Sequence, residues 1–227
     1  DKQDPASVHY QLGEAYFRNG DYISALKELL ESIKFKEDNP DAQCLLGTTY
    51  YQLGKYSEAE KHLLSAIKLR ENYSEARNNL GLTYMVLGRW DEAIKEFELC
   101  IDDIFYRNPS QAYTNMGIVY VKKGDSARAE DCFKKALERN PSFCPARLNL
   151  GDLYSKLGRR EEAIYELKET VRLCPNIPRA RILLGVELNA IGKRDEACKE
   201  FAEAKKLDPQ GPLGKEAGDY QKLLNCP

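Results

Sequence analysis

The chain has 227 residues, of which 42% are hydrophobic and 31% are charged, and its formal net charge is −2 with both signs mixed throughout. This balance leaves no basic stripe of the kind that neutralises nucleic-acid phosphates, so we expect no nucleic-acid partner. No run of about 18 or more apolar residues is present, and the chain as given therefore contains no candidate for a membrane-spanning helix.

A leucine–glycine pair recurs along the chain at nearly constant spacing. Successive copies are separated by 34, 34, 36, 34 and 34 residues. The copies are Leu12–Gly13, Leu46–Gly47, Leu80–Gly81, Met116–Gly117, Leu150–Gly151 and Leu184–Gly185. Such a period indicates a repeat array, in which no unit can bury its apolar face alone and neighbours must stack.

Each copy predicts a first helix, a glycine turn and a second helix. In the first copy the turn is marked by Gly20, and the second helix carries Ala25 and the bulky Leu29. An aromatic residue, here Tyr16, precedes the turn in every copy except the last, where Leu188 replaces it. Small glycine and alanine allow the two antiparallel helices to approach closely, and the larger residues fill the space between neighbouring pairs.

These positions resemble the tetratricopeptide repeat. The resemblance implies an all-α fold, a right-handed superhelical solenoid of six repeats with a C-terminal capping helix. We expect one repeat domain over 1–209 and a capping tail over 210–227. The expected repeats are 6–39, 40–73, 74–109, 110–143, 144–177 and 178–209. Gly211, Pro212 and Gly214 should end the last repeat, and Lys215 to Asn225 should form a polar helix that covers it.

The seven cysteines show no CxxC spacing, so no zinc or thioredoxin-like site is expected. Small core residues are the simplest interpretation, and Cys100 indeed occupies a place held by alanine in other copies. Cys144 and Cys174, however, lie at the start of the first helix and the end of the second helix of one repeat. An antiparallel hairpin brings those ends together, so a disulfide is an alternative, as is one between Cys198 and Cys226 in an oxidising compartment.

No catalytic constellation is apparent. The two histidines, His9 and His62, lack triad or metal partners at helical spacing, and every glycine has a place in the repeat. We therefore expect neither an enzyme nor a bound cofactor or metal.

The first helices of such arrays line a concave wall that holds peptides, and we expect the partner-binding residues there. An apolar helix or strand of another protein is the expected guest, unless superhelical curvature or the tail covers the wall. The inward apolar and aromatic positions are Tyr10, Phe17, Leu45, Tyr51, Leu82, Met85, Val86, Ile118 and Val121.

Asn79, Asn115 and Asn149 share one inward position in three consecutive repeats. Because an amide side chain both donates and accepts, a ladder of them would suit the backbone of an extended peptide. The alternative is that they bond neighbouring helices or solvent. No register places Lys and Arg beside these asparagines, so the carboxylate clamp of chaperone-tail receptors is absent.

The join after the third repeat, residues 101–110, is longer than the others and carries Phe105 and Tyr106. We expect these rings to pack against the ends of adjacent helices. Two segments also resemble the type IV pilus biogenesis and stability proteins, which are six-repeat outer-membrane lipoproteins that act as pilotins for the secretin pore. These segments are this join with residues 111–117 that follow it, and residues 179–186 of the last repeat. The cysteine content departs from that family.

The resemblance implies a pilotin that helps secretin subunits to reach the outer membrane and form multimers there. It also implies that the protein lies on the periplasmic face of that membrane and contacts the membrane through a lipidated cysteine upstream of Asp1. Asp1 would then be the first residue of a mature or shortened chain. We expect a monomer. The alternatives are a cytoplasmic adaptor or co-chaperone, and the repeat region of a larger enzyme.

Overall fold

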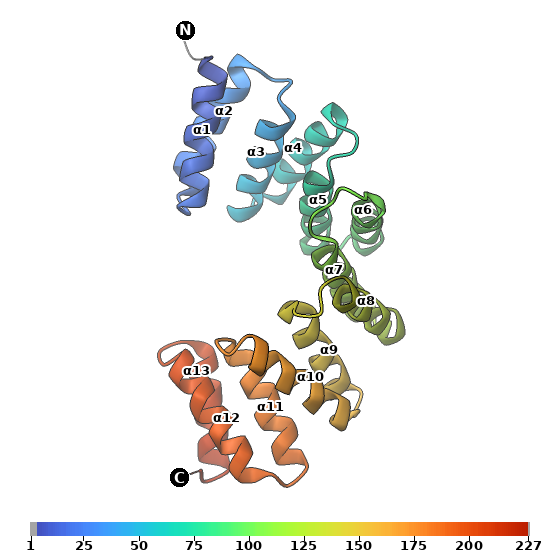
Figure 1. Cartoon of the computed structure of the whole chain (residues 1–227). Helices are drawn as coiled ribbons and strands as arrows, with labels where there is room; N and C mark the ends of the chain where they lie inside the picture. Colours follow the sequence, from blue (N-terminus) through green and yellow to red (C-terminus); the bar gives the residue numbers. More distant parts are fainter. Residues whose placement is uncertain (1–3, 227) are drawn as a thin grey trace. The chain divides into compact units, whose positions relative to one another are not determined.

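The computed structural model describes residues 4–226, and over these residues the chain forms thirteen α-helices and no strand (Figure 1). The chain forms two compact units, and the boundary between them falls between Val119 and Tyr120. The first contains α1 (Pro5–Arg18), α2 (Tyr22–Phe35), α3 (Pro40–Gln52), α4 (Tyr56–Leu69), α5 (Ser74–Val86), α6 (Trp90–Asp102) and most of α7 (Pro109–Lys122). The second contains α8 (Ser126–Arg139), α9 (Cys144–Lys156), α10 (Arg160–Leu173), α11 (Pro178–Ala190), α12 (Arg194–Leu207) and α13 (Pro212–Leu223). The all-α repeat fold predicted from the sequence is confirmed.

A glycine in the left-handed region ends the first helix of each repeat. At the end of α5, Gly88 has φ +72°, and its N–H donates to the carbonyl of Met85 at 3.2 Å. The N–H of Arg89 then donates to the carbonyl of Tyr84 at 2.9 Å, which satisfies a second carbonyl of the last turn. A residue with a Cβ would be strained at this φ, so glycine is needed to reverse the chain within a few residues.

In five of the six repeats, the glycine of the leucine–glycine pair lies against the bulky residue of the second helix. A Cβ on Gly81 would lie only 2.6 Å from Cε1 of Phe97, which is fully buried. The same close contact joins Gly13 to Leu29, Gly47 to Leu63, Gly151 to Leu167, and Gly185 to Phe201. The absence of a side chain at these glycines therefore sets the distance between the paired helices.

A polar pair separated by 19 residues adds a second link between the paired helices. Arg77 donates to Glu96 at 3.0 Å, and its other terminal nitrogen donates to the carbonyl of Glu71 in the loop before α5. The guanidinium thus holds the first helix, the second helix and the preceding loop together. Equivalent pairs are His9 with Glu28, Gln43 with His62, Arg147 with Glu166, and Arg181 with Glu200.

Helix α13 packs on α12 and also contacts α11. It begins at Pro212, so Gly214 lies inside the helix rather than before it as we expected from the sequence. The physical reason is a close approach of two backbones, because a Cβ on Gly214 would overlap the carbonyl oxygen of Asp208. The carboxylate of Asp208 accepts the N–H groups of Leu213 and Gly214 and so satisfies donors of the first turn.

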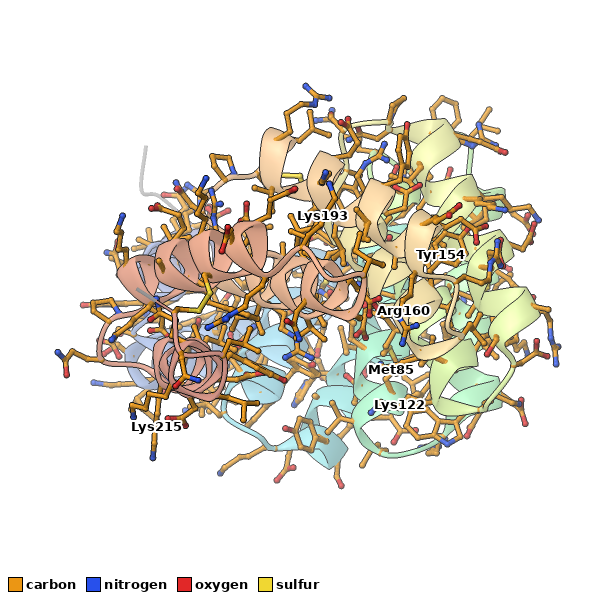
Figure 2. The ribbon with its side chains drawn as sticks, turned by 90° about the horizontal axis from the view of Figure 1, so that it is seen from below. Met85, Lys122, Tyr154, Arg160, Lys193 and Lys215 are labelled. Carbon is orange, nitrogen blue, oxygen red and sulfur yellow. A yellow bond between two sulfur atoms is a disulfide. The ribbon has the colours of Figure 1, made fainter. Side chains whose placement is uncertain are left out.

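Two disulfides lie in the second unit, and Figure 2 shows disulfides as yellow bonds. Cys144 pairs with Cys174, which joins the start of α9 to the end of α10. Cys198 of α12 pairs with Cys226, which follows α13. The other three cysteines, Cys44, Cys100 and Cys132, are buried in the core.

Substitution of Gly81 by alanine should destabilise the protein by about 1–3 kcal/mol, because the new methyl group would overlap the ring of Phe97. Alanine otherwise favours helices over glycine, so the sign distinguishes packing from helix propensity. Gly218→Ala in α13 is the matched control, since a Cβ there would meet only the side chain of Lys205 at 3.8 Å. Urea denaturation compares the two variants, and equal effects would contradict the packing argument.

Reduction of the disulfides should weaken the second unit selectively. A cross-link of this loop length contributes on the order of 2–4 kcal/mol. Hydrogen exchange with and without dithiothreitol should therefore show lost protection in α9, α10, α12 and α13 and unchanged protection in α1 to α6. A uniform loss in both units would show that the disulfides do not act locally.

Candidate partner-binding surfaces

In the first unit, the predicted inner residues lie on α1, α3, α5 and α7. Val86 is exposed, Asn115 is buried and the others are half-buried. Part of their surface is used by neighbours, because the ring of Phe17 lies 5.3 Å from that of Tyr22 and the ring of Tyr51 lies 5.6 Å from that of Tyr56. These half-buried residues are Tyr10, Phe17, Leu45, Tyr51, Asn79, Leu82, Met85 and Ile118.

The asparagines of the first unit bond to each other and to neighbouring helices. Asn79 donates to the hydroxyl of Thr48 at 2.9 Å and accepts from Asn78 at 3.4 Å. The side chain of Asn115 donates to Oδ1 of Asn78 at 3.3 Å and accepts from the amide of Gln111 at 2.9 Å. These bonds tie α3, α5 and α7 together, so several of the donors and acceptors expected to face a peptide are already engaged.

Two predicted residues belong to the second unit. Val121 is half-buried near the end of α7. Asn149 is half-buried on α9, and its amide donates to the carbonyl of Pro145 in the same helix at 2.7 Å. This amide therefore bonds its own helix, and not a neighbouring helix as the alternative from the sequence supposed.

The long join between α6 and α7 places its two aromatic residues differently. Tyr106 is half-buried, and burial raises the pKa of its hydroxyl above the ordinary value. Phe105 is 83% exposed, so the expectation that it packs against helix ends is wrong. The carboxylate of Asp103 accepts the N–H of Phe105 at 2.9 Å and the hydroxyl of Ser74 at 2.5 Å. This tight turn directs the Phe105 ring away from the helices.

At the junctions between repeats the consensus leucine of the later repeat is buried, and the aromatic residue is buried at most of them and half-buried at Tyr50. Leu46, Leu80, Leu150 and Leu184 are buried, as are Tyr84 and Tyr154. The covering element is the second helix of the preceding repeat, as in the contacts of α2 with α3, α4 with α5, and α10 with α11. The junctions therefore show which element covers this part of a first helix.

At some of these junctions, a charged cluster joins the second helix of one repeat to the next repeat. Glu130 of α8 accepts from Arg159 at 2.6 Å and from the hydroxyl of Tyr154 at 2.9 Å, and the guanidinium lies 4.2 Å from the centre of the Tyr154 ring. In the first unit, Arg89 donates to Glu60 at 2.8 Å and lies over the ring of Tyr84. We call this arrangement of glutamate, tyrosine and arginine the junction cluster.

The first repeat has no preceding helix among residues 4–226, and its equivalent face is open. Leu12 is 44% exposed and Tyr16 is 38% exposed, whereas the consensus leucine is buried in later repeats and the aromatic residue is buried or, at Tyr50, half-buried. The surrounding positions of α1 carry no charge over almost three turns. We call this surface the first-repeat face; it consists of Ser7, Val8, Gln11, Leu12, Ala15 and Tyr16. At the place of Arg89 and Arg159, the first repeat has Asp21.

The first-repeat face is not apparent from the sequence, because the first copy has the same consensus residues as the later copies. The other site types find no support in the described part of the chain. It contains no group of three or more His, Cys, Asp or Glu side chains that could hold a metal ion. None of its helices is long and apolar enough to cross a membrane.

The chain consists of helix pairs that repeat at a nearly constant period and leave some apolar helix faces uncovered. These features define a helical-repeat interaction scaffold. Models described as TPR repeat match residues 13–54 and 47–88, and models described as tetratricopeptide repeat match residues 73–142, 114–178 and 148–212. The matches together span most of the sequence. The chain belongs to the tetratricopeptide-repeat family.

Solved structures share this fold over nearly the whole chain. PilW, described as a widely conserved type IV pilus biogenesis factor, has 24% identity and a TM-score of 0.82 over 92% of this chain and 96% of PilW. PilF of Pseudomonas aeruginosa has 20% identity and a TM-score of 0.81 over 95% of this chain and 97% of PilF. YrrB, described as having an unusual peptide-binding site, has 19% identity and a TM-score of 0.59 over 84% of this chain and 97% of YrrB. No curated protein sequence matches the chain significantly.

Substitution of Glu130 by glutamine should show what the junction cluster contributes. Burial opposes ionisation, but hydrogen bonds from Lys134, Arg159 and Tyr154 outweigh it and lower the pKa of Glu130 to about 2. Its stabilisation is therefore complete above the ordinary value, about 4.3, and is lost as the pH falls towards 2. We expect Glu130→Gln to lose roughly 1–3 kcal/mol at pH 7 and less at pH 3.

Urea denaturation at both pH values measures this difference. Glu138→Gln is the control, since Glu138 is exposed on the same helix. A Glu130→Gln effect that is the same at pH 7 and pH 3 would contradict the role of the ionised carboxylate.

Proposed function

We propose that this protein is a pilotin of the type IV pilus system, which binds a secretin subunit and assists its transfer to the outer membrane and its multimerisation there. Three things support the proposal: the resemblance of the long join and the last repeat to that family, the shared fold with PilW and PilF, and an open apolar surface suited to another polypeptide. The fold alone is widespread, with 452 significantly similar chains, so it does not choose the partner.

The open first-repeat face is the observation that carries the binding function. It is apolar and uncharged at its centre, and later repeats cover the same positions with an amphipathic helix. A guest helix would bury Leu12 and Tyr16, each worth on the order of 1–2 kcal/mol. At two internal junctions the glutamate of the covering helix meets an arginine, whereas the first repeat offers Asp21. The guest should therefore carry Lys or Arg at that position.

The mechanism follows from this geometry. A secretin subunit must keep apolar segments out of water until it inserts in the membrane. Seated on the first-repeat face, one such segment would lose its exposed apolar surface to Leu12 and Tyr16. Release then requires only separation of two helix faces, without unfolding of the repeat array.

The disulfides support a periplasmic location. Disulfides persist in oxidising compartments and are rare where thiols are kept reduced. Burial raises the pKa of Cys44 and of Cys100 to about 12, so these thiols stay protonated and do not compete for disulfide exchange. With a lipidated cysteine upstream of Asp1, the protein would lie at the periplasmic face of the outer membrane. A cytoplasmic adaptor would have little use for these bonds.

A pair of acidic substitutions, Leu12→Asp with Tyr16→Asp, should abolish the proposed function. We expect affinity for the purified secretin subunit to fall by at least about tenfold, since two charges would face an apolar guest. Biolayer interferometry measures the binding, and the yield of detergent-resistant secretin multimers measures the consequence in cells. Both side chains are partly exposed, so circular dichroism should show an unchanged fold.

Two controls make the result decisive. Leu64→Asp places the same charge at an exposed leucine of α4 outside this face and should leave binding unchanged. Leu82→Asp with Met85→Asp tests the inner wall of the first unit instead. If only this second pair abolishes binding, the inner wall is the site, and if neither pair does, the secretin proposal is wrong.

A further inference from the structure

Helix α13 occupies the place of the first helix of a seventh repeat. Pro212 follows Pro178, the first residue of α11, by one period of 34 residues, and Gly214 and Gly218 take the places of Ala180 and Leu184. In the other repeats of each unit the first helix packs against the second helix of the same repeat, as α5 does with α6 and α11 with α12. No described residue forms such a second helix after α13.

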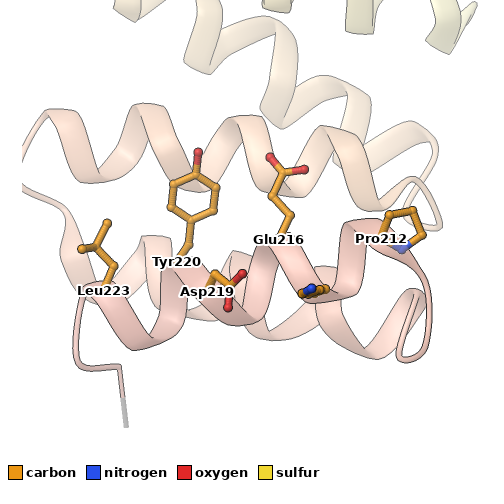
Figure 3. Close-up of a pocket in the computed structure, with 6 residues that line it drawn as sticks. Pro212, Glu216, Asp219, Tyr220 and Leu223 are labelled. Carbon is orange, nitrogen blue, oxygen red and sulfur yellow. The ribbon is translucent and has the colours of Figure 1, made fainter.

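The face of α13 that this missing helix would cover forms a shallow hollow (Figure 3). Its volume is about 590 Å³, and most of its lining is apolar. Leu223 is 74% exposed, and Lys215 is also exposed on α13 (Figure 2). We call this surface the α13 face; it consists of Pro212, Lys215, Glu216, Asp219, Tyr220 and Leu223.

The internal repeats show what charge the guest should carry. Lys215 takes the place of His9, Arg77, Arg147 and Arg181, each of which pairs with a glutamate of the second helix at 2.5–3.0 Å. These glutamates are Glu28, Glu96, Glu166 and Glu200. A helix seated on the α13 face should therefore present a carboxylate to Lys215.

The internal repeats also indicate how large the guest residue after this carboxylate can be. In the repeats each of these glutamates is followed by a leucine or phenylalanine that packs on a glycine without a Cβ. On α13 the place of that glycine is held by Asp219. A large guest residue would collide with this side chain, so the carboxylate should be followed by a small residue.

The chain that directly follows α13 is held elsewhere. Asn225 has a positive φ of +48°, and the turn glycines of the repeats also have positive φ values. The next residue, Cys226, is bonded to Cys198 of α12. Arg194 also donates to the carbonyls of Leu224 and Asn225. These contacts keep the end of the described chain on α12 and leave the α13 face open.

From this geometry we infer that the α13 face binds an amphipathic helix of a partner protein, which completes the seventh repeat. The guest carries an acidic residue opposite Lys215, a small residue next to it, and aliphatic residues over Tyr220 and Leu223. This site is separate from the first-repeat face, and the inference does not depend on the secretin proposal.

A synthetic peptide based on α10 tests the inference. It has the sequence of residues 160–173 with Leu167→Ala, so that Glu166 is followed by a small residue. Fluorescence anisotropy of the labelled peptide with the oxidised full-length chain should show saturable binding. The unchanged α10 sequence should bind on the order of tenfold more weakly, because Leu167 would meet Asp219.

Variants of the chain test the contacts. Lys215→Glu should weaken binding on the order of tenfold, and a peptide with Glu166→Lys should restore it. Leu223→Asp should also weaken binding, whereas Lys206→Glu, an exposed lysine of α12 outside this face, should have no effect. Leu12→Asp with Tyr16→Asp should leave peptide binding intact, which separates this site from the first-repeat face.

Absence of saturable binding, or binding that ignores the charge exchange at Lys215, would overturn the inference. Self-association that Lys215→Glu and Leu223→Asp abolish, detected by sedimentation, would overturn the assignment to a foreign helix and give the α13 face to a second copy of this chain.

Discussion

The contact between a glycine of the first helix and a bulky residue of the second is the constraint on which the rest of the structure depends. Where Gly81 meets Phe97, the missing side chain lets two helices approach until the ring touches backbone. That distance also brings Arg77 within reach of Glu96 and of the loop carbonyl of Glu71. The helix pair then behaves as one block, with a face of leucine and tyrosine that only a neighbouring block can cover.

An array built in this way leaves a helix face uncovered at each end of the part that the structure describes. Among residues 4–226, no second helix precedes the first repeat, which leaves Leu12 and Tyr16 exposed, and none follows α13, which leaves Leu223 exposed. The two faces are chemically different, because one is uncharged and bordered by Asp21 and the other carries Lys215 and Asp219. One repeat design therefore provides two docking surfaces with different requirements, and the internal junctions indicate what each should accept.

The sequence predicted the features that repeat. The period placed the helix pairs and glycine turns, and the hairpin ends placed Cys144 close to Cys174 because antiparallel helices bring such ends together. The pairs 19 residues apart could also have been found, since Arg77, Arg147 and Arg181 share a position and so do their glutamates.

The features that do not repeat were beyond the pattern. The bonds of Asn79 to Thr48 and of Asn115 to Asn78 depend on neighbours 31 and 37 residues away, which the shared position of the asparagines does not reveal. The exposed ring of Phe105 depends on how Asp103 closes one loop. The open face at Leu12 could not be seen at all, because a consensus residue looks the same whether or not a neighbouring helix covers it.

The α13 face has a further property that sequence cannot show. The disulfide of Cys226 with Cys198 and the bonds from Arg194 fix α13 before any guest arrives. A guest there loses its own conformational freedom but does not have to order its receptor, so more of the contact energy remains as affinity. No disulfide holds α1 among the described residues, and its stability comes from packing on α2 and from the His9 and Glu28 pair. A guest on the first-repeat face would lack this fixed receptor, and the lower affinity would suit the reversible binding that the proposed pilotin function requires.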